Sequence, residues 1–298
     1  MSIVKSAVKK IMFPVLSVLN KLQSLVYHLN IENTENSLRR IYEGLLSVSR
    51  FGDGEFDLIN GRGLKFQSYT PEIAARLREV LAAENPPESF KTCIPFAYSS
   101  VSHLNRQSIL FWVPYFLKYR KKIYLPCNKK YEYLDSQITR IYINRRSRQE
   151  SSVYFSLWKK IWQDKDILIV EGSESRFGAG NDLFSGAKTV GRIICPSKNA
   201  FSVYEEILNT VIQKAGGRLV LLVLGPAATV MAYDLARKGI RALDIGNMDM
   251  EYEWFCRNVS ERVIIPGKYS HEVAGGDAVQ ENTDDVYLSQ IICRVGLA

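Results

Sequence analysis

Two short stretches of the chain place charged side chains beside glycines in nearly the same pattern. Residues 47–56 read SVSRFGDGEF, and residues 175–184 read SRFGAGNDLF. In the first stretch, only Gly54 separates Asp53 from Glu55. If this segment is extended or turn-like, both carboxylates project to one side and could bind one Mg²⁺ or Mn²⁺, whose remaining positions stay open for phosphate oxygens. Because Asp-Gly pairs also form ordinary turns, a polar turn without an ion is the alternative.

The second stretch has features of an anion-binding loop. Gly178 and Gly180 permit positive φ angles and a close approach of the backbone to a phosphate, and Arg176 offers several N–H donors to the same anion. Asn181 and Asp182 follow directly. The loop lacks the third glycine of the dinucleotide-binding fingerprint, and a tight turn alone can also require glycines, so this pattern does not specify its ligand.

Apolar, strand-like runs alternate with helix-like runs in the second half of the chain. This alternation predicts βαβ units, and therefore an α/β fold with a Rossmann-like parallel sheet and helices on both faces. Asn199 and Pro226 are expected at the starts of two of the helices. The predicted strands cover residues 166–171, 192–195, 218–224 and 240–245, with a further strand over residues 122–126.

The loops after the four predicted strands contain most of the glycine, asparagine, aspartate and serine residues of this half. Ligands of open parallel sheets bind beyond the carboxyl ends of the strands, where these loops and the helix N-termini meet. The sequence therefore predicts a binding site at this edge. Asp244 ends the last predicted strand, and Asp249 and Glu251 follow it.

Composition narrows the class of protein. A chain of 298 residues with 46% hydrophobic residues can form one large α/β domain. Five scattered cysteines and only three histidines argue against a disulfide framework or a structural zinc site, and favour a cytoplasmic protein. No run approaches the roughly 18 apolar residues that a membrane-spanning helix needs, and we expect no signal peptide.

The formal net charge of +8 has one main source, the stretch from Lys118 to Arg148, which contains ten basic and two acidic residues. Tyrosines interleave with the charges. Such a stretch suits nucleic acid, a phosphorylated ligand or a membrane surface, and it is equally compatible with a solvated helical face.

The first 31 residues contain four lysines and no acidic residue, and their apolar residues repeat at helical spacing. This predicts an amphipathic helical segment within residues 1–44. Its apolar side could pack on the rest of the chain or on a second copy in a homodimer. A peripheral contact of residues 1–31 with the inner, anionic membrane surface is the remaining option.

Five motifs, taken together and in order, resemble those of the bacterial GT-D fold glycosyltransferases, a group formerly catalogued as a domain of unknown function. The resemblance runs from about Ser47 to about Glu272. One departure is Asn247, where the family usually has a histidine that could affect the substrate. The motifs are SRFGDGEF, EGSESRFGAGNDLF, CPSKNAF, LGPAATVMAYDLARKG and DIGNMDMEYEWF.

The resemblance implies one glycosyltransferase domain over residues 45–298. It also implies a UDP-sugar donor, with glucose or a related hexose, and a Mn²⁺ or Mg²⁺ ion at the Asp53-x-Glu55 motif. The acceptor would be a hydroxyl of a surface glycoprotein glycan or a polysaccharide. On this hypothesis Asp249 or Glu251 is the catalytic base, and the nucleotide-sugar contacts are Arg50, Gly52, Gly54, Arg176, Gly178, Gly180, Asn181 and Asp182.

Two other classes of protein remain as alternatives. One is a Rossmann-type protein that binds a dinucleotide or adenosyl cofactor without a metal. The other is a module that binds nucleic acid through residues 118–148, for which steep salt dependence would be diagnostic. We favour the glycosyltransferase and do not expect a nucleic-acid partner.

Overall fold

The computed structural model describes residues 2–270, 272–276, 278–280 and 283–297, with side chains from Phe13 onward. Its centre is a nine-stranded sheet in the order β1-β4-β3-β2-β8-β7-β5-β6-β9, in which every pair of neighbours is parallel. The strands are β1 (Asn30–Ile31), β2 (Ser47–Arg50), β3 (Phe90–Ile94), β4 (Glu132–Asp135), β5 (Asp166–Gly172), β6 (Thr189–Cys195), β7 (Leu219–Val223), β8 (Ala242–Asp244) and β9 (Ile291–Arg294).

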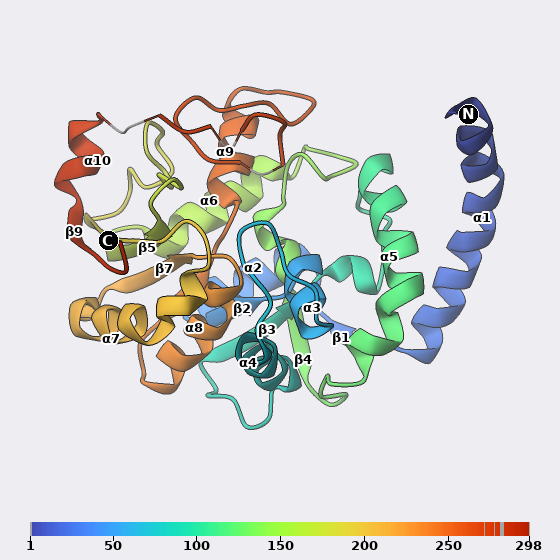
Figure 1. The fold of residues 1–298 in the computed structure, drawn as a ribbon, viewed down its shortest axis with the longest axis horizontal. Coiled ribbons are helices and arrows are strands. Elements are labelled where there is room, and N and C mark those ends of the chain that lie inside the picture. Colours follow the sequence, from blue (N-terminus) through green and yellow to red (C-terminus); the bar gives the residue numbers. More distant parts are fainter. Residues whose placement is uncertain (1, 271, 277, 281–282, 298) are drawn as a thin grey trace.

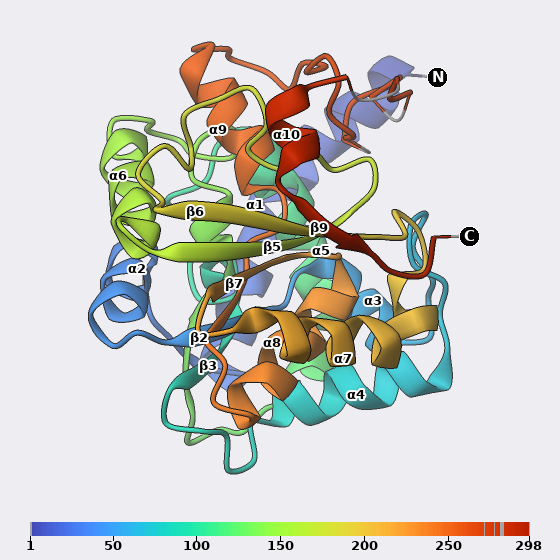
Figure 2. The same cartoon turned by 90° about the vertical axis from the view of Figure 1, so that its left-hand side faces the viewer.

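Helices cover both faces of this sheet, as Figures 1 and 2 show. One face packs on α4, α5, α7 and α8, and the other on α2, α6 and α9. The helices are α1 (Ser2–Val26), α2 (Thr34–Glu43), α3 (Asp53–Ile59), α4 (Pro71–Ala82), α5 (Arg106–Tyr124), α6 (Ser151–Trp162), α7 (Tyr204–Ala215), α8 (Pro226–Arg237), α9 (Met248–Cys256) and α10 (Asp285–Ser289). Short 3₁₀ turns follow β3, β4 and β6, at Phe96–Tyr98, Ser136–Thr139 and Ala200–Val203.

Strand β5 shows why the sheet divides the apolar interior into two cores. Leu168 and Val170 belong to the core under α7 and α8, whereas Ile167 and Ile169 belong to the core under α6. Successive side chains of a strand point to opposite faces, so a strand buried on both sides reads as a continuous apolar run. The predicted Rossmann-like α/β fold is therefore confirmed.

The predicted strand over residues 122–126 is wrong, because residues up to Tyr124 belong to helix α5. Trp112, Phe116, Tyr119 and Ile123 are all buried and recur at helical spacing. The predicted N-cap role of Asn199 is wrong as well. Its side-chain oxygen accepts a hydrogen bond from the Ser68 amide, at 2.7 Å, and a 3₁₀ turn precedes α7.

Residues before the expected domain start at residue 45 also take part in the sheet. Strand β1 pairs with β4, and α2 packs against α6. Helix α1 differs from both, since it lies at the edge of the molecule with α5 between it and the sheet (Figure 1). No helix among the described residues is long and apolar enough to cross a membrane.

Candidate functional site

A cavity of about 670 Å³ lies at the carboxyl ends of the central strands. Its walls come from the segments that follow strands β2 to β8, from the start of α5, and from the irregular segment that follows α9. Strand β2 leads on to β3 and β4 on one side of the sheet, while β8 and β7 lie on its other side. Ligands of open α/β sheets bind at such divergence points. The prediction that these loops meet at one edge is thus confirmed.

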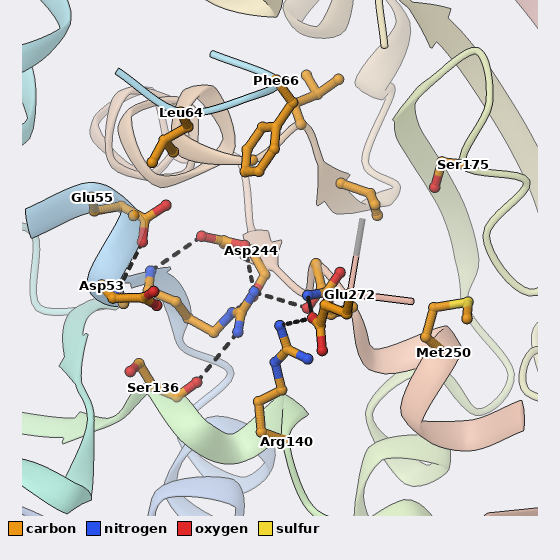
Figure 3. A pocket seen from close by; sticks show the side chains of 18 of the residues that line it. Asp53, Glu55, Leu64, Phe66, Ser136, Arg140, Ser175, Asp244, Met250 and Glu272 are labelled. Atoms are coloured by element: carbon orange, nitrogen blue, oxygen red, sulfur yellow. Dashed lines mark hydrogen bonds and ion pairs between the residues drawn. The ribbon is translucent and has the colours of Figure 1, made fainter. Parts of the chain in front are cut away.

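Asp53 and Glu55 face the cavity from the first turn of α3 (Figure 3). The expectation of an extended segment is wrong here, because the helix begins at Asp53 itself. Two residues apart on a helix, the side chains diverge by about 200°. Glu55, however, folds back and accepts a hydrogen bond from the Gly52 amide at 2.7 Å. Both carboxylates therefore stay at the N-terminus of α3, where the helix dipole favours negative charge.

Burial makes this pair of carboxylates reluctant to ionise. It raises the pKa of Asp53, against the opposing charge of Arg140. For Glu55, burial and the charge of Asp244 together raise the pKa to about 7. The protein thus offsets the negative charge of Asp53 and Glu55 only in part.

These carboxylates fit a hard divalent cation. Oxygen ligands are those that Mg²⁺ and Mn²⁺ prefer, and a bound cation would relieve the repulsion that raises the pKa values. Among the described residues no group of three or more histidine, cysteine, aspartate or glutamate side chains is arranged to hold a metal. Asp53 and Glu55 would consequently leave most coordination positions to water and ligand.

Arg50, at the end of β2, lines the same cavity but its guanidinium is fully engaged by the protein. It donates to the Asp244 backbone oxygen at 2.7 Å, to Asp244 Oδ1 at 3.1 Å and to the Gly246 oxygen at 3.0 Å. It also donates to Ser136 and Thr139. Since a guanidinium has five N–H groups, each has an acceptor, and Arg50 joins β2, β8 and the turn after β4.

Arg140 lies opposite Asp53 and retains unused hydrogen-bonding capacity. Its Nη2 forms an ion pair with Glu272 at 2.5 Å, shown in Figure 3. Its Nη1 is buried and has no hydrogen-bond partner among the described residues. Glu272 also pairs with Arg262 and accepts from Asn247. A buried, unpaired guanidinium nitrogen beside a cavity is a ready donor to an anionic ligand.

Asp249 lines the cavity from α9 and has an internal counter-charge. The Lys268 Nζ lies 2.7 Å from Asp249 and 2.9 Å from Glu253, and all three residues are buried. Asn181 donates to both carboxylates, at 2.7 and 2.8 Å. Burial alone would raise the pKa of Glu253, but Lys268 and Asn181 lower it. Asp249 is therefore held in one orientation, with lone pairs left over.

Glu251, the other predicted base, points away from the cavity. It is fully buried and accepts hydrogen bonds from the amides of Tyr142 and Ile143, at 2.8 and 2.9 Å. It does not line the cavity. Burial raises its pKa despite the nearby charge of Arg140. Glu251 thus supports the chain beneath the site.

The loop after β5 contributes less to the cavity than its sequence indicates. Gly178 and Gly180 do adopt positive φ angles, at 71° each, but they lie outside the cavity lining. Arg176 donates to the backbone oxygens of Gly267 and Gln280, and Asp182 pairs with Lys159 at 2.8 Å. Of the predicted contacts, the cavity brings together Arg50, Gly52, Asp53, Gly54, Glu55 and Asp249.

Several cavity residues had no distinct signal in the sequence. Arg140 was one of ten basic residues in the stretch from Lys118 to Arg148. That stretch is not a continuous surface, since Arg120 and Arg145 are buried. Glu272 comes from an irregular segment far along the chain, as does Lys268, which does not line the cavity but pairs with Asp249. Their nearest sequence signal is the position of Glu272 at the end of the family resemblance.

The fold and this site define a class of protein, a glycosyltransferase-type α/β domain. The model of the glycosyltransferase GT-D fold family matches residues 48–273. The chain therefore belongs to that family, which confirms the resemblance seen in the motifs. Asn247, the departure from the family motifs, lines the cavity, and its backbone is left-handed, with a φ of 65°.

Solved structures and curated relatives agree with this assignment. A structure described as a highly conserved domain of unknown function with a distinct glycosyltransferase fold superposes with a TM-score of 0.86 and 35% identity, covering 95% of this chain and 99% of that chain. A glycosyltransferase from Streptococcus sanguinis superposes with a TM-score of 0.83 and 41% identity, covering 90% of this chain and 99% of that one.

Two curated streptococcal proteins are longer than this chain. The chain is 41% identical, over 90% of its length, to the probable glycosyl transferase Gly of Streptococcus gordonii. It is 33% identical, also over 90% of its length, to glycosyltransferase GlyD of Streptococcus pneumoniae. It spans 39% and 33% of their respective lengths.

Proposed function

We propose that this chain transfers a hexose from a UDP-sugar to a hydroxyl of a glycan or glycoprotein acceptor. The observation that carries the proposal is the incompletely neutralised pair Asp53 and Glu55. Across the strand-end cavity lies the Arg140 Nη1, to which no described residue forms a hydrogen bond. Such a place suits a ligand that brings both a cation and negative charge. A metal-chelated nucleoside diphosphate has that chemistry.

The donor diphosphate would lie between the N-terminus of α3 and Arg140. Asp53 and Glu55 would hold Mn²⁺ or Mg²⁺, which supplies charge neutralisation for the departing diphosphate. Arg140 Nη1 would donate to a phosphate oxygen. Arg50, with its donors engaged, would act by fixing the strand ends rather than by direct contact.

Asp249 is our candidate for the residue that deprotonates the acceptor hydroxyl. It lines the cavity, unlike Glu251, and Lys268 and Asn181 fix its carboxylate. A base must lie within hydrogen-bond reach of the proton that it removes, and its pKa must leave it ionised. The Lys268 ammonium group, 2.7 Å away, supplies a counter-charge to this carboxylate.

The start of α5 offers a surface for the acceptor sugar. Phe111 lines the cavity and is half exposed. Its ring stacks on Tyr115, with centroids 5.7 Å apart and an interplanar angle of 19°. Gln107 and Ser108 supply polar groups beside it. An aromatic face next to hydrogen-bonding side chains is suited to a sugar ring, which has apolar and hydroxyl-bearing sides.

The test is release of UDP from UDP-glucose, UDP-galactose and UDP-N-acetylglucosamine, followed with Mn²⁺ and with a chelator. We expect metal-dependent release from one of these donors, faster when glycoside acceptors are added. NAD and S-adenosylmethionine serve as control ligands. Binding of either control without metal, and no turnover of any UDP-sugar, would favour a Rossmann-type cofactor-binding protein instead.

A further inference from the structure

Helix α1 presents its apolar side to solvent. The exposed fractions are 59% for Val18, 55% for Leu22, 71% for Leu25 and 69% for Val26. Val15 and Leu19 are exposed as well, so these six residues, which we call the α1 stripe, form one continuous helical face. Amphipathic helices normally bury this face, and here the domain does not cover it. Figure 1 shows the helix at the edge of the molecule.

The opposite side of α1 is the one that packs on the domain, and it is the more polar one. Asn20 is buried and accepts a hydrogen bond from Arg120 Nη2 at 3.0 Å. Arg120 is itself buried, and donates to the Tyr98 backbone oxygen at 2.6 Å. Gln23 donates to the Leu117 oxygen at 3.4 Å. If α1 rotated to bury the stripe, the buried Arg120 guanidinium would lose one of its two acceptors, the Asn20 side chain, which is costly. The outward orientation is therefore specified.

Aromatic side chains join the end of α1 to the end of α5. Tyr27 and Tyr124 contact each other, with ring centroids 5.5 Å apart. The neighbour of Tyr124, Leu125, is 61% exposed. The exposed Leu125 thus lies directly beside the contact between the two helices.

Lysines border this surface, and acidic residues are absent from the first 31 residues of the sequence. Lys21 is exposed on α1. Lys121 is exposed on α5, between Leu117 and Tyr124, which both contact α1. It therefore lies on the α5 face next to α1. Three further lysines of the sequence, Lys5, Lys9 and Lys10, belong to the first half of α1.

We propose that the α1 stripe docks on an anionic lipid bilayer, with α1 lying in the plane of the interface. Apolar side chains would enter the acyl boundary while the lysines contact anionic headgroups. A second copy of the chain is the less suitable occupant, because pairing two α1 helices would bring together two basic segments without an acidic partner. This inference does not depend on the proposed function.

The test is co-sedimentation of the full chain with vesicles of phosphatidylcholine alone or with 30 mol % phosphatidylglycerol. We expect binding to the anionic vesicles and at least tenfold weaker binding to the neutral ones. The double variant Val18→Glu/Leu22→Glu should reduce binding to anionic vesicles at least tenfold, since both side chains point away from the domain. The matched control is Val153→Glu, whose side chain is 49% exposed on α6 and lies away from α1. It should bind as the wild type does.

Charge is tested separately by Lys21→Gln and Lys121→Gln. Each should weaken binding about fivefold at low salt, in line with a contribution of about 1 kcal/mol per basic residue near an anionic surface. Equal binding to both vesicle types, or unchanged binding by the double variant, would overturn the proposal. So would a dimer in sedimentation equilibrium that Val18→Glu/Leu22→Glu dissociates, because the stripe would then be covered by a second copy. UDP binding, measured without vesicles, should stay unchanged in every variant.

Discussion

Two acidic clusters border the cavity, and they differ in the source of their counter-charge. Asp249 and Glu253 share the ammonium group of Lys268, at 2.7 and 2.9 Å. Within the described part of the chain, Asp53 and Glu55 form no ion pair, and burial raises the pKa of both although the charge of Arg140 opposes this for Asp53. The negative charges of Asp249 and Glu253, which we call the paired cluster, thus have their counter-charge within the protein. Asp53 and Glu55, which we call the open cluster, ionise readily only when a cation binds. We therefore expect the open cluster to be the part of the site that depends on the ligand.

The largest effect is expected from removing the charge of Asp53. Asp53→Asn keeps the size of the side chain but weakens cation binding, so metal-dependent turnover of the UDP-sugar should fall by roughly 10³-fold or more. Asp57→Asn is the matched control, because Asp57 lies one turn further along α3 and pairs with Arg62 instead. Steady-state kinetics of both variants checks this. Retained activity in Asp53→Asn would remove the carboxylate from the mechanism.

For the paired cluster, we expect the loss of its cation to change the free energy of unfolding. Lys268→Met leaves Asp249 and Glu253 buried without their cation, which should lower the free energy of unfolding by about 3 kcal/mol. Lys188→Met, at an exposed lysine 3.7 Å from Asp166, should change it by less than about 0.5 kcal/mol. Urea denaturation measures both. An equally small change in both variants would show that Lys268 does not neutralise this cluster.

Arg140 faces the open cluster, and its loss should act on catalysis. We expect Arg140→Gln to lower kcat by about 10- to 100-fold, since one donor to the developing phosphate charge disappears. Arg148→Gln is the control, because Arg148 donates to the Val259 and Ser260 backbone oxygens away from the cavity. A rise in the acceptor KM with an unchanged kcat would place Arg140 on the acceptor instead.

The last effect concerns the pH dependence of the free energy of unfolding. Glu55 has a folded pKa of about 7 against an ordinary value of 4.5, so the folded state binds a proton that the unfolded state releases between these pH values. The free energy of unfolding without metal should therefore fall as the pH rises from about 4.5 to 7, by about 3 kcal/mol in total. Glu55→Gln should remove this decline. Mn²⁺ should stabilise the wild type above pH 7 and stabilise the variant less, because only Asp53 then remains as a carboxylate ligand.

Thermal unfolding of both proteins across this pH range, with and without Mn²⁺, provides the measurement. The same decline in wild type and Glu55→Gln would assign it to another group.

The strands were predictable because buried parallel strands read as apolar runs. Residues 166–171 and 218–224 fall on β5 and β7 for this reason. The run at 122–126 is similar in composition, yet tertiary packing of Ile123 places most of it in a helix. A short apolar run alone does not distinguish a strand from a helix.

The site was predictable where it depends on strand ends, and less so elsewhere. Asp53, Glu55 and Asp249 follow strands and line the cavity. Lys268 and Glu272 reach it through an irregular segment without periodicity, so no pattern could position them. Arg50 was expected to bind an anion, but its side chain turned out to be saturated by acceptors from two other segments. The sequence does not show which hydrogen-bond acceptors surround a side chain in the folded protein.

Calorimetric titration of UDP tests the central claim most directly. It would be performed with and without Mn²⁺, on the wild type, on Asp53→Asn and on Asp57→Asn. We predict binding that requires both the metal and Asp53, with Asp57→Asn equal to the wild type. UDP binding of equal strength without metal and in Asp53→Asn would contradict the account, because the open cluster would then not be the place where the cation and the diphosphate meet.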